Sequence, residues 1–157
     1  MKKFLLILLL LIPIGLLVSC SDDISDPSSD TDCQVTLTFN NVAVINGVIY
    51  TTRDYPLEVE SIDAYSPDGT TKAISEVEYS IDDHEVLTAK YAPYTGRFDT
   101  RYLSAGEHPL GVYIDLLQSD LTRIPDSMQY NFTVVPTVED LPAGAELGTF
   151  TQTFKIG

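Results

Sequence analysis

Three tyrosines and three cations are interleaved in one short stretch of the chain, and their side chains are of the types that bind ligands. The stretch contains Lys90, Tyr91, Tyr94, Arg97, Arg101 and Tyr102. Aromatic rings supply large amphipathic contact area, and arginine adds directional hydrogen bonds. We therefore predict that Tyr91, Tyr94, Arg97, Arg101 and Tyr102 bind a ligand, either sugar rings or a protein partner. The alternative is that Tyr91 belongs to the core and that the other side chains coat an ordinary loop.

The residues that catalysis would need are scattered. His84 lies between two acidic residues in a predicted hairpin, and His108 lies in a predicted turn, so neither has metal-ligand spacing. The sequence contains no nucleophile elbow, no phosphate-binding loop and no His-Glu-x-x-His. A Ser-His-Asp site assembled from distant residues is conceivable, as in almost any chain. We predict no catalytic residues, no cofactor and no metal, and a hydrolase remains a minor alternative.

Two groups of acidic residues allow a calcium interpretation. They are Asp82, Asp83 and Glu85, and Asp115, Asp120 and Asp126. Calcium takes six or more oxygens at defined spacing, and neither group has the order of an EF-hand. The favoured interpretation is that these are solvated acids that keep sheet edges from aggregating.

Apolar residues alternate with polar ones over most of the chain, which predicts strands. The clearest inward faces are Val35-Leu37-Phe39, Val77-Tyr79-Ile81, Leu110-Val112-Ile114-Leu116, Met128-Tyr130-Phe132-Val134 and Phe150-Phe154-Ile156. Asn46-Gly47 predicts a tight hairpin, residues 66–69 a turn, residues 82–84 another turn, and Glu60-Ser61 a bulge. Residues 115–121 offer at most one helical turn. Seven or more short strands predict an all-β antiparallel sandwich.

Residues 77–115 resemble the middle of bacterial immunoglobulin-like modules. The matching pieces are Val77-Glu78-Tyr79-Ser80-Ile81-Asp82, Tyr91-Ala92-Pro93-Tyr94, Phe98-Asp99-Thr100, Leu103-Ser104-Ala105-Gly106-Glu107-His108 and Val112-Tyr113-Ile114-Asp115. The resemblance implies an immunoglobulin-like β-sandwich over residues 33–157, and it implies no function, because this fold hosts many tasks. Residues 116–125 depart from the pattern, and we expect them to bulge from one end of the domain.

The N-terminus has the order of a secretory signal, with Lys2 and Lys3 before an apolar run that is too short to span a bilayer comfortably. The run ends in Leu17-Val18-Ser19-Cys20, which resembles the lipobox of bacterial lipoproteins. The resemblance implies that residues 1–19 are removed and that Cys20 is lipidated and holds the protein to a membrane. Residues 20–32, rich in aspartate and serine, are expected to form a flexible tether.

Two short pieces resemble signals of the Bacteroidota. Ser21-Asp22-Asp23 resembles the acidic export signal of surface lipoproteins, which implies the outer membrane and its exterior face. Asp126-Ser127-Met128 resembles an O-glycosylation signal, which makes Ser127 a candidate glycan acceptor. The alternatives are a plain solvated spacer and a loop before a strand.

The net charge and the cysteine content limit the kinds of partner that the chain can bind. Without Lys2 and Lys3, seven cations face 23 acidic residues, so the chain repels phosphate backbones and nucleic-acid binding is not expected. Anionic headgroups repel it too, so attachment depends on the lipid. Lipidation of Cys20 leaves Cys33, just before the first predicted strand, either as a small covered residue or as an intermolecular or reactive thiol.

Together these features predict a non-catalytic outer-membrane surface lipoprotein that binds or adheres to an unidentified glycan or surface protein. One alternative is an accessory glycan-binding lipoprotein of a polysaccharide-uptake system. The other is a fimbrial or assembly subunit that adds its terminal strand, residues 149–156, to a neighbour.

Overall fold

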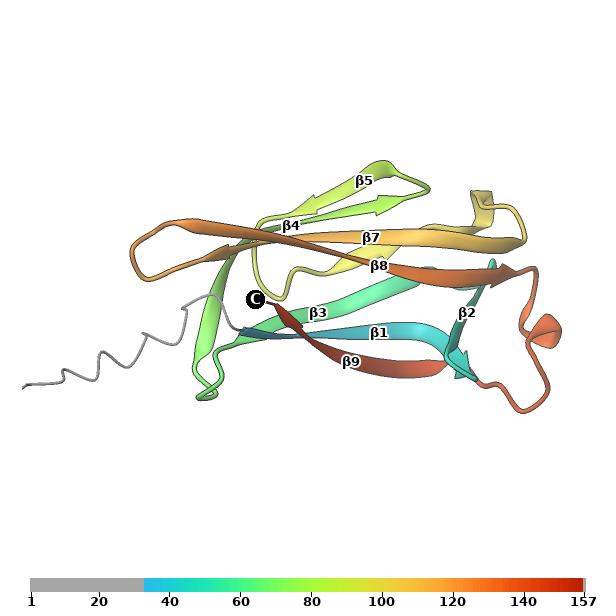
Figure 1. The fold of residues 1–157 in the computed structure, drawn as a ribbon. Coiled ribbons are helices and arrows are strands. Elements are labelled where there is room, and N and C mark those ends of the chain that lie inside the picture. The colour runs from blue at the N-terminus through green and yellow to red at the C-terminus, as the bar shows by residue number, and fades with distance from the viewer. Residues whose placement is uncertain (1–32, 157) are drawn as a thin grey trace, which may run out of the picture.

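The computed structural model describes residues 33–156, so the predictions for the signal, for Cys20 and for the tether concern residues outside the described part (Figure 1). The described residues form nine strands and two short 3₁₀ helices, and the all-β class is confirmed. The elements are β1 (Cys33–Ile45), β2 (Val48–Thr52), β3 (Leu57–Tyr65), β4 (Thr71–Ile81), β5 (His84–Ala89), β6 (Gly96–Phe98), η1 (Thr100–Tyr102), β7 (Gly106–Leu117), β8 (Arg123–Val135), η2 (Val138–Asp140) and β9 (Gly148–Ile156). Among these residues no helix is long and apolar enough to cross a membrane.

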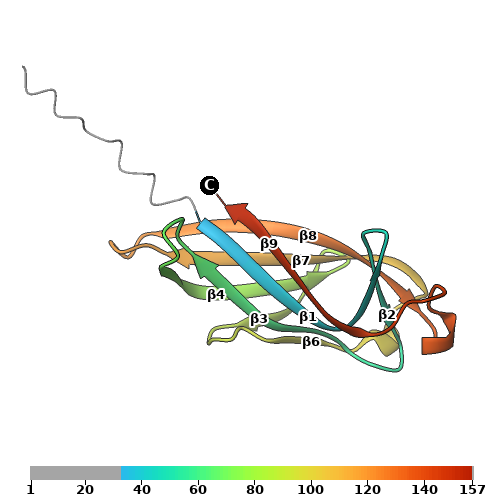
Figure 2. The ribbon, with the colours of Figure 1, turned by 90° about the horizontal axis from the view of Figure 1, so that it is seen from below.

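The strands lie in two layers that hydrogen bonds join into a closed ring (Figures 1 and 2). One layer has the order β9-β1-β3-β6, and the other has the order β5-β4-β7-β8-β2. The β1–β2 and β3–β4 pairings connect the layers, so β1, β2, β8, β7, β4 and β3 close on themselves. This arrangement differs from two separate sheets, and the β2–β8 pairing is parallel, which corrects the prediction of a purely antiparallel sandwich.

The change of layer occurs within β1. Residues 33–40 and Val42 pair with β3 or β9, whereas Ala43–Ile45 pair with β2. Just before this change Asn41 has a φ of 58°, and its side-chain amide donates to the Pro56 carbonyl at 3.2 Å. Asparagine tolerates this left-handed conformation better than most residues, so it turns the strand at little cost.

The predicted turns and bulge are confirmed. Asn46 and Gly47 have φ values of 51° and 80°, and Asp82 and Asp83 have values of 52° and 63°, as tight primed hairpin turns require. Thr38 pairs with Ser61 and Phe39 pairs with Val59, which leaves Glu60 as the extra residue of the bulge. The Gly69 amide donates to the Ser66 carbonyl at 2.9 Å and closes the predicted 66–69 turn.

The structure corrects the local predictions for residues 115–125 and for His108. Residues 115–121 form no helical turn, and residues 116–125, which do lie at one end of the domain, are not a long connection between strands. Instead β7 and β8 continue as one hairpin in which Leu116 pairs with Ile124, and only residues 118–122 turn (Figure 1). His108 lies within β7 and pairs with Phe132, so it is a strand residue and not a turn residue.

The alternating apolar residues meet between the layers and form one core. Its largest fully buried side chains include Tyr79, Phe39 and Phe132. The Tyr79 hydroxyl donates to the Tyr94 carbonyl, which satisfies its polar atom. Burial raises the pKa of the Tyr79 hydroxyl and raises the pKa of Tyr130 to about 12.

The raised pKa values of Tyr79 and Tyr130 predict that the domain loses stability at alkaline pH. An unfolded chain ionises tyrosine near pH 10, whereas the folded chain retains both protons to higher pH. The unfolded state therefore binds fewer protons above that pH, and the free energy of unfolding falls as the pH rises from about 10 toward 12. Urea titrations across this range check the result. The Tyr130 hydroxyl donates to the Met128 sulfur at 3.5 Å, and the stability of Tyr130→Phe, which lacks it, should fall less steeply with pH than that of the wild type. Equal slopes would contradict the assignment to Tyr130.

Candidate functional site

The three tyrosines of the predicted binding stretch differ in their exposure to solvent. Tyr91 and Tyr102 are each 85% exposed, so Tyr91 is not a core residue. Tyr94 is half-buried, packs against the core, and donates its hydroxyl to the Ile74 carbonyl at 2.6 Å. Its hydroxyl thus serves the fold, while Tyr91 and Tyr102 present open rings.

Arg97 and Arg101 line the same pocket, at the end of the molecule that carries η1. The pocket has a volume of about 420 Å³ and is lined by Arg53, Asp54, Pro56, Arg97, Asp99 and Arg101. We call it the arginine pocket. Three of the seven lysines and arginines in residues 33–156 therefore meet at one place in an acidic protein. Sequence reasoning missed Arg53 and Asp54, because nothing local marks them and they precede Arg97, Asp99 and Arg101 by more than 40 positions.

Strand pairing explains why these distant segments meet. Leu57 of β3 pairs with Phe98 of β6, and Glu58 pairs with Arg97, so the residues before β3 lie beside those after β6. Thr100 then ties the two segments together. It is fully buried, and its hydroxyl is 2.7 Å from the Thr52 carbonyl and 2.9 Å from the Tyr55 carbonyl.

Arg101 is held by its neighbour Asp99. Its Nε lies 2.9 Å from Asp99 Oδ1, and its Nη2 lies 2.6 Å from Asp99 Oδ2. These bonds, together with the one from the Arg101 amide, lower the pKa of Asp99 to about 2 and raise the pKa of Arg101. The guanidinium also lies 5.8 Å from the centre of the Tyr102 ring, within cation–π range. Arg101 and Asp99 therefore stay charged and fixed across the physiological pH range.

The other two arginines keep more of their hydrogen-bonding capacity. Arg97 contacts Glu58 through Nε at 3.3 Å. Arg53 makes no side-chain hydrogen bond or ion pair within residues 33–156, and its Nε is buried without a partner. A buried donor without an acceptor is rare and costly, so it calls for an explanation. Because Nε is closed even to water, an oxygen of a ligand would reach Arg53 through its two terminal nitrogens, which have no partner among residues 33–156.

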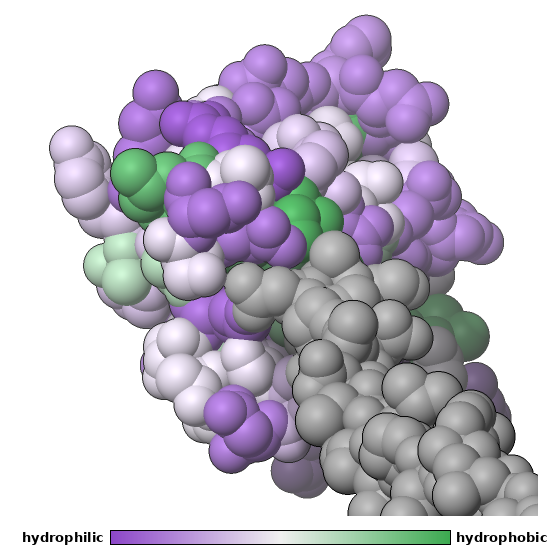
Figure 3. Space-filling model, turned by 60° about the vertical axis from the view of Figure 1, so that its left-hand side comes forward, coloured by the Kyte–Doolittle hydropathy of each residue, from purple (hydrophilic) through white to green (hydrophobic). Residues whose placement is uncertain are grey.

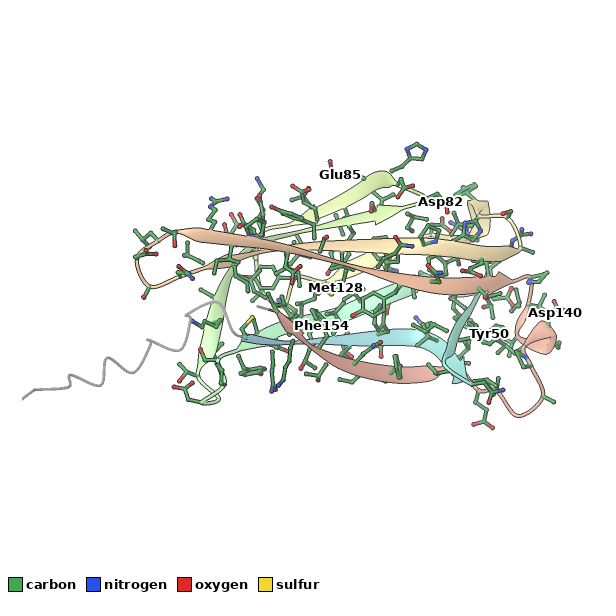
Figure 4. The ribbon with its side chains drawn as sticks, in the orientation of Figure 1. Tyr50, Asp82, Glu85, Met128, Asp140 and Phe154 are labelled. Atoms are coloured by element: carbon green, nitrogen blue, oxygen red, sulfur yellow. The ribbon has the colours of Figure 1, made fainter. Side chains whose placement is uncertain are left out.

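A second hollow, of about 370 Å³, adjoins the arginine pocket and shares Arg97 and Asp99 with it. Its other lining residues are Ile81, Asp82, His84, Val86, Phe98 and Leu103. Figure 4 shows Asp82 at this end of the molecule, next to the turn between β4 and β5. The two hollows therefore meet at Arg97 and Asp99.

Asp82, His108 and Ser104 form a hydrogen-bonded chain with the order of a catalytic triad. His108 Nδ1 lies 2.8 Å from Asp82 Oδ2, and its Nε2 lies 3.3 Å from Ser104 Oγ. The same Nε2 lies closer, at 3.0 Å, to the Ser104 carbonyl, and the imidazole is buried. A general base must offer a lone pair to the proton it removes, whereas Nε2 here lies nearest to a carbonyl oxygen, to which it can only donate. The chain instead joins the start of β7 to the turn after β4.

The remaining candidates lie elsewhere. Ser127 is exposed in the middle of β8, opposite Tyr113, and borders a groove of about 300 Å³; it is a strand residue and does not lie in a loop. Cys33 is the first residue of β1 and is 3% exposed. Within the described residues no three histidine, cysteine, aspartate or glutamate side chains are gathered as a metal would require. Apart from its grey atoms, the face in Figure 3 is mostly hydrophilic, with its hydrophobic residues set apart from one another.

Comparison with known proteins adds little. No protein-family model matches the chain, and no curated protein matches it. One solved structure, described as "Structures of Clostridium thermocellum CbhA fibronectin(III)-like modules", aligns with 59% of this chain and 94% of its own length, at 19% identity and a TM-score of 0.35.

Proposed function

We propose that the protein is a non-catalytic outer-membrane lipoprotein, held by a lipid on Cys20, which presents a binding or adhesion domain to the cell exterior. We further propose that the domain is a variant of the immunoglobulin-like sandwich in which β2 closes the ring. The observation that carries the proposal is the convergence of three arginines on one pocket in a strongly acidic chain.

The position of the pocket suits this role. In Figure 1 β1 begins in the left half of the molecule, while η1 and the β4–β5 turn lie in the right half. A lipid on Cys20 would attach the domain through the residues that precede β1. The arginine pocket would then face away from the membrane, toward ligands in the medium.

The glycan-binding alternative gains support from the exposed ring of Tyr102 beside the pocket, because tyrosine faces stack on sugar rings. The assembly alternative would require β9 to leave β1, with which it pairs from Cys33–Ile156 to Val42–Gly148. Comparing molecular size before and after deletion of residues 149–156 distinguishes an assembly subunit from a monomeric binder.

Cys20→Ser should release the protein from the membrane fraction, because a hydroxyl cannot replace the thiol in forming the lipid anchor. The experiment expresses the full chain in a bacterium that processes lipoproteins and compares membrane and soluble fractions. Cys33→Ala is the matched control: it removes the other cysteine, and we expect it to remain in the membrane. Protease treatment of intact cells then reports which face the domain occupies. A Cys20→Ser protein that stays in the membrane would refute the anchor.

A further inference from the structure

The arginine pocket holds more hydrogen-bond donors than the protein uses. Among residues 33–156 only two buried side-chain polar atoms lack a partner, Thr52 Oγ1 and Arg53 Nε; they belong to adjacent residues, of which Arg53 lines this pocket. Arg97 uses only Nε, toward Glu58. Each guanidinium carries five N–H donors in a planar fork. The guanidinium groups of Arg53 and Arg97 therefore have N–H donors free for the oxygens of an anion, which arginine binds in bidentate fashion.

The same pocket also presents acceptors. Asp54 and Asp99 line it beside the arginines, and the low pKa of Asp99 keeps this carboxylate ionised. Carboxylates repel a ligand that carries only negative charge, but they accept hydrogen bonds from hydroxyl groups. The lining thus matches a ligand that combines an oxyanion with neighbouring hydroxyls, which is the chemistry of an acidic sugar.

Exposed aromatic rings stand next to this polar lining. Tyr55, between the lining residues Asp54 and Pro56, is 49% exposed, and Tyr102, next to Arg101, is 85% exposed. Tyrosine rings supply an apolar face for a pyranose and a hydroxyl for its polar edge. An acidic peptide would gain less here, because its carboxylates would meet Asp54 and Asp99 without hydroxyls to offset the repulsion.

We propose that the arginine pocket binds the oxyanion of an acidic glycan, a carboxylate or a sulfate on a sugar ring, with Arg53 and Arg97 as the principal donors. The proposal deepens the binding function proposed above and rests on it. Asp54 accepts from the sugar hydroxyls, and Tyr55 or Tyr102 covers a ring face. The terminal nitrogens of Arg53 find in the ligand the acceptors that residues 33–156 do not supply.

Calorimetric titration of the full mature lipoprotein in a neutral detergent tests this with five probes. An oligogalacturonate supplies carboxylates, and its methyl ester supplies the same sugars without the charge. A dextran sulfate oligosaccharide supplies sulfates on a different backbone, and unmodified dextran oligosaccharide is its neutral control. Oligoglutamate supplies carboxylates without hydroxyls.

We expect the wild type to bind at least one charged oligosaccharide and to bind its neutral counterpart roughly tenfold or more weakly. Arg53→Gln and Arg97→Gln should each weaken binding of that probe by roughly tenfold or more, since each removes a charge-assisted hydrogen-bond donor. Lys155→Gln removes the same charge from β9, outside the pocket lining, and should leave the affinity within about twofold. Circular dichroism confirms that each variant is folded.

The outcomes distinguish a uronate from a sulfate ligand, and they distinguish failure of the glycan-binding proposal from failure of the lipid-anchor proposal. Binding of oligogalacturonate alone assigns a uronate, and binding of the sulfated probe alone assigns a sulfate; both support the pocket. Equal binding of neutral probes, unchanged affinity in the arginine variants, tighter binding of oligoglutamate, or no binding of any probe would overturn the inference. None of these results touches the Cys20 anchor, whose failure would appear in fractionation while the titrations still gave binding.

Discussion

Phe39→Ala should lower the free energy of unfolding by about 3–5 kcal/mol, the range for removing a buried aromatic side chain. Phe39 is 1% exposed and lies just before the place where β1 changes layer. Its ring meets Tyr130 of β8 edge to face, with centroids 5.2 Å apart, and stacks on Phe150 of β9 at 6.4 Å. The substitution therefore removes one side chain that both layers share.

This loss is large compared with the whole stability of a domain, which is typically about 5–15 kcal/mol. Urea titrations followed by circular dichroism would measure it, with the slope against denaturant unchanged if both states keep their exposed area. Phe154→Ala is the matched control. Phe154 lies on β9 and is only half-buried, so its removal leaves a smaller cavity and a clearly smaller loss. Equal losses in the two variants would show that Phe39 is not the central contact between layers.

The sequence was a good guide to strands and tight turns because both depend on neighbouring residues. Alternation places Val77, Tyr79 and Ile81 on the inner face of β4, and all three are buried. Asn46-Gly47 forms a hairpin because its residues tolerate positive φ, and that preference belongs to the dipeptide itself.

The ring closure could not be predicted in the same way. It depends on where β2 finds its second partner, and the parallel pairing of Ile49 with Phe132 joins residues more than 80 positions apart. No local pattern encodes such a contact. The positive φ of Asn41 is the nearest local sign, but asparagine occurs in many loops without redirecting a strand.

Only part of the candidate site could be predicted from the sequence, for a related reason. Arg97 and Arg101 stand out because they are cations within an aromatic stretch, whereas Arg53 becomes part of the site only through the pairing of β3 with β6. Tyr94 looked equivalent to Tyr91, yet the Tyr94 amide donates to the Tyr91 carbonyl in a turn that directs one ring inward and leaves the other in water. The exposure of a residue in an irregular connection follows from such turns and not from period-two alternation.

Thr100→Val should cost about 1–3 kcal/mol of stability and should also weaken binding at the arginine pocket. Valine keeps the shape of threonine but removes the hydroxyl, so the carbonyls of Thr52 and Tyr55 lose their donor in a buried place. Thr100→Ser is the matched control, because it keeps the hydroxyl and loses only a methyl group.

The two readouts together test whether Thr100 positions the pocket. The residue joins the segment of Arg53 and Asp54 to η1, which carries Arg101. If this tie sets the spacing of the arginines, Thr100→Val binds the acidic oligosaccharide several-fold more weakly at temperatures where it is fully folded, and Thr100→Ser binds it nearly as the wild type does. A Thr100→Val protein with lower stability but unchanged affinity would mean that strand pairing between β3 and β6 alone fixes the pocket. The hydroxyl would then serve the fold and not the site.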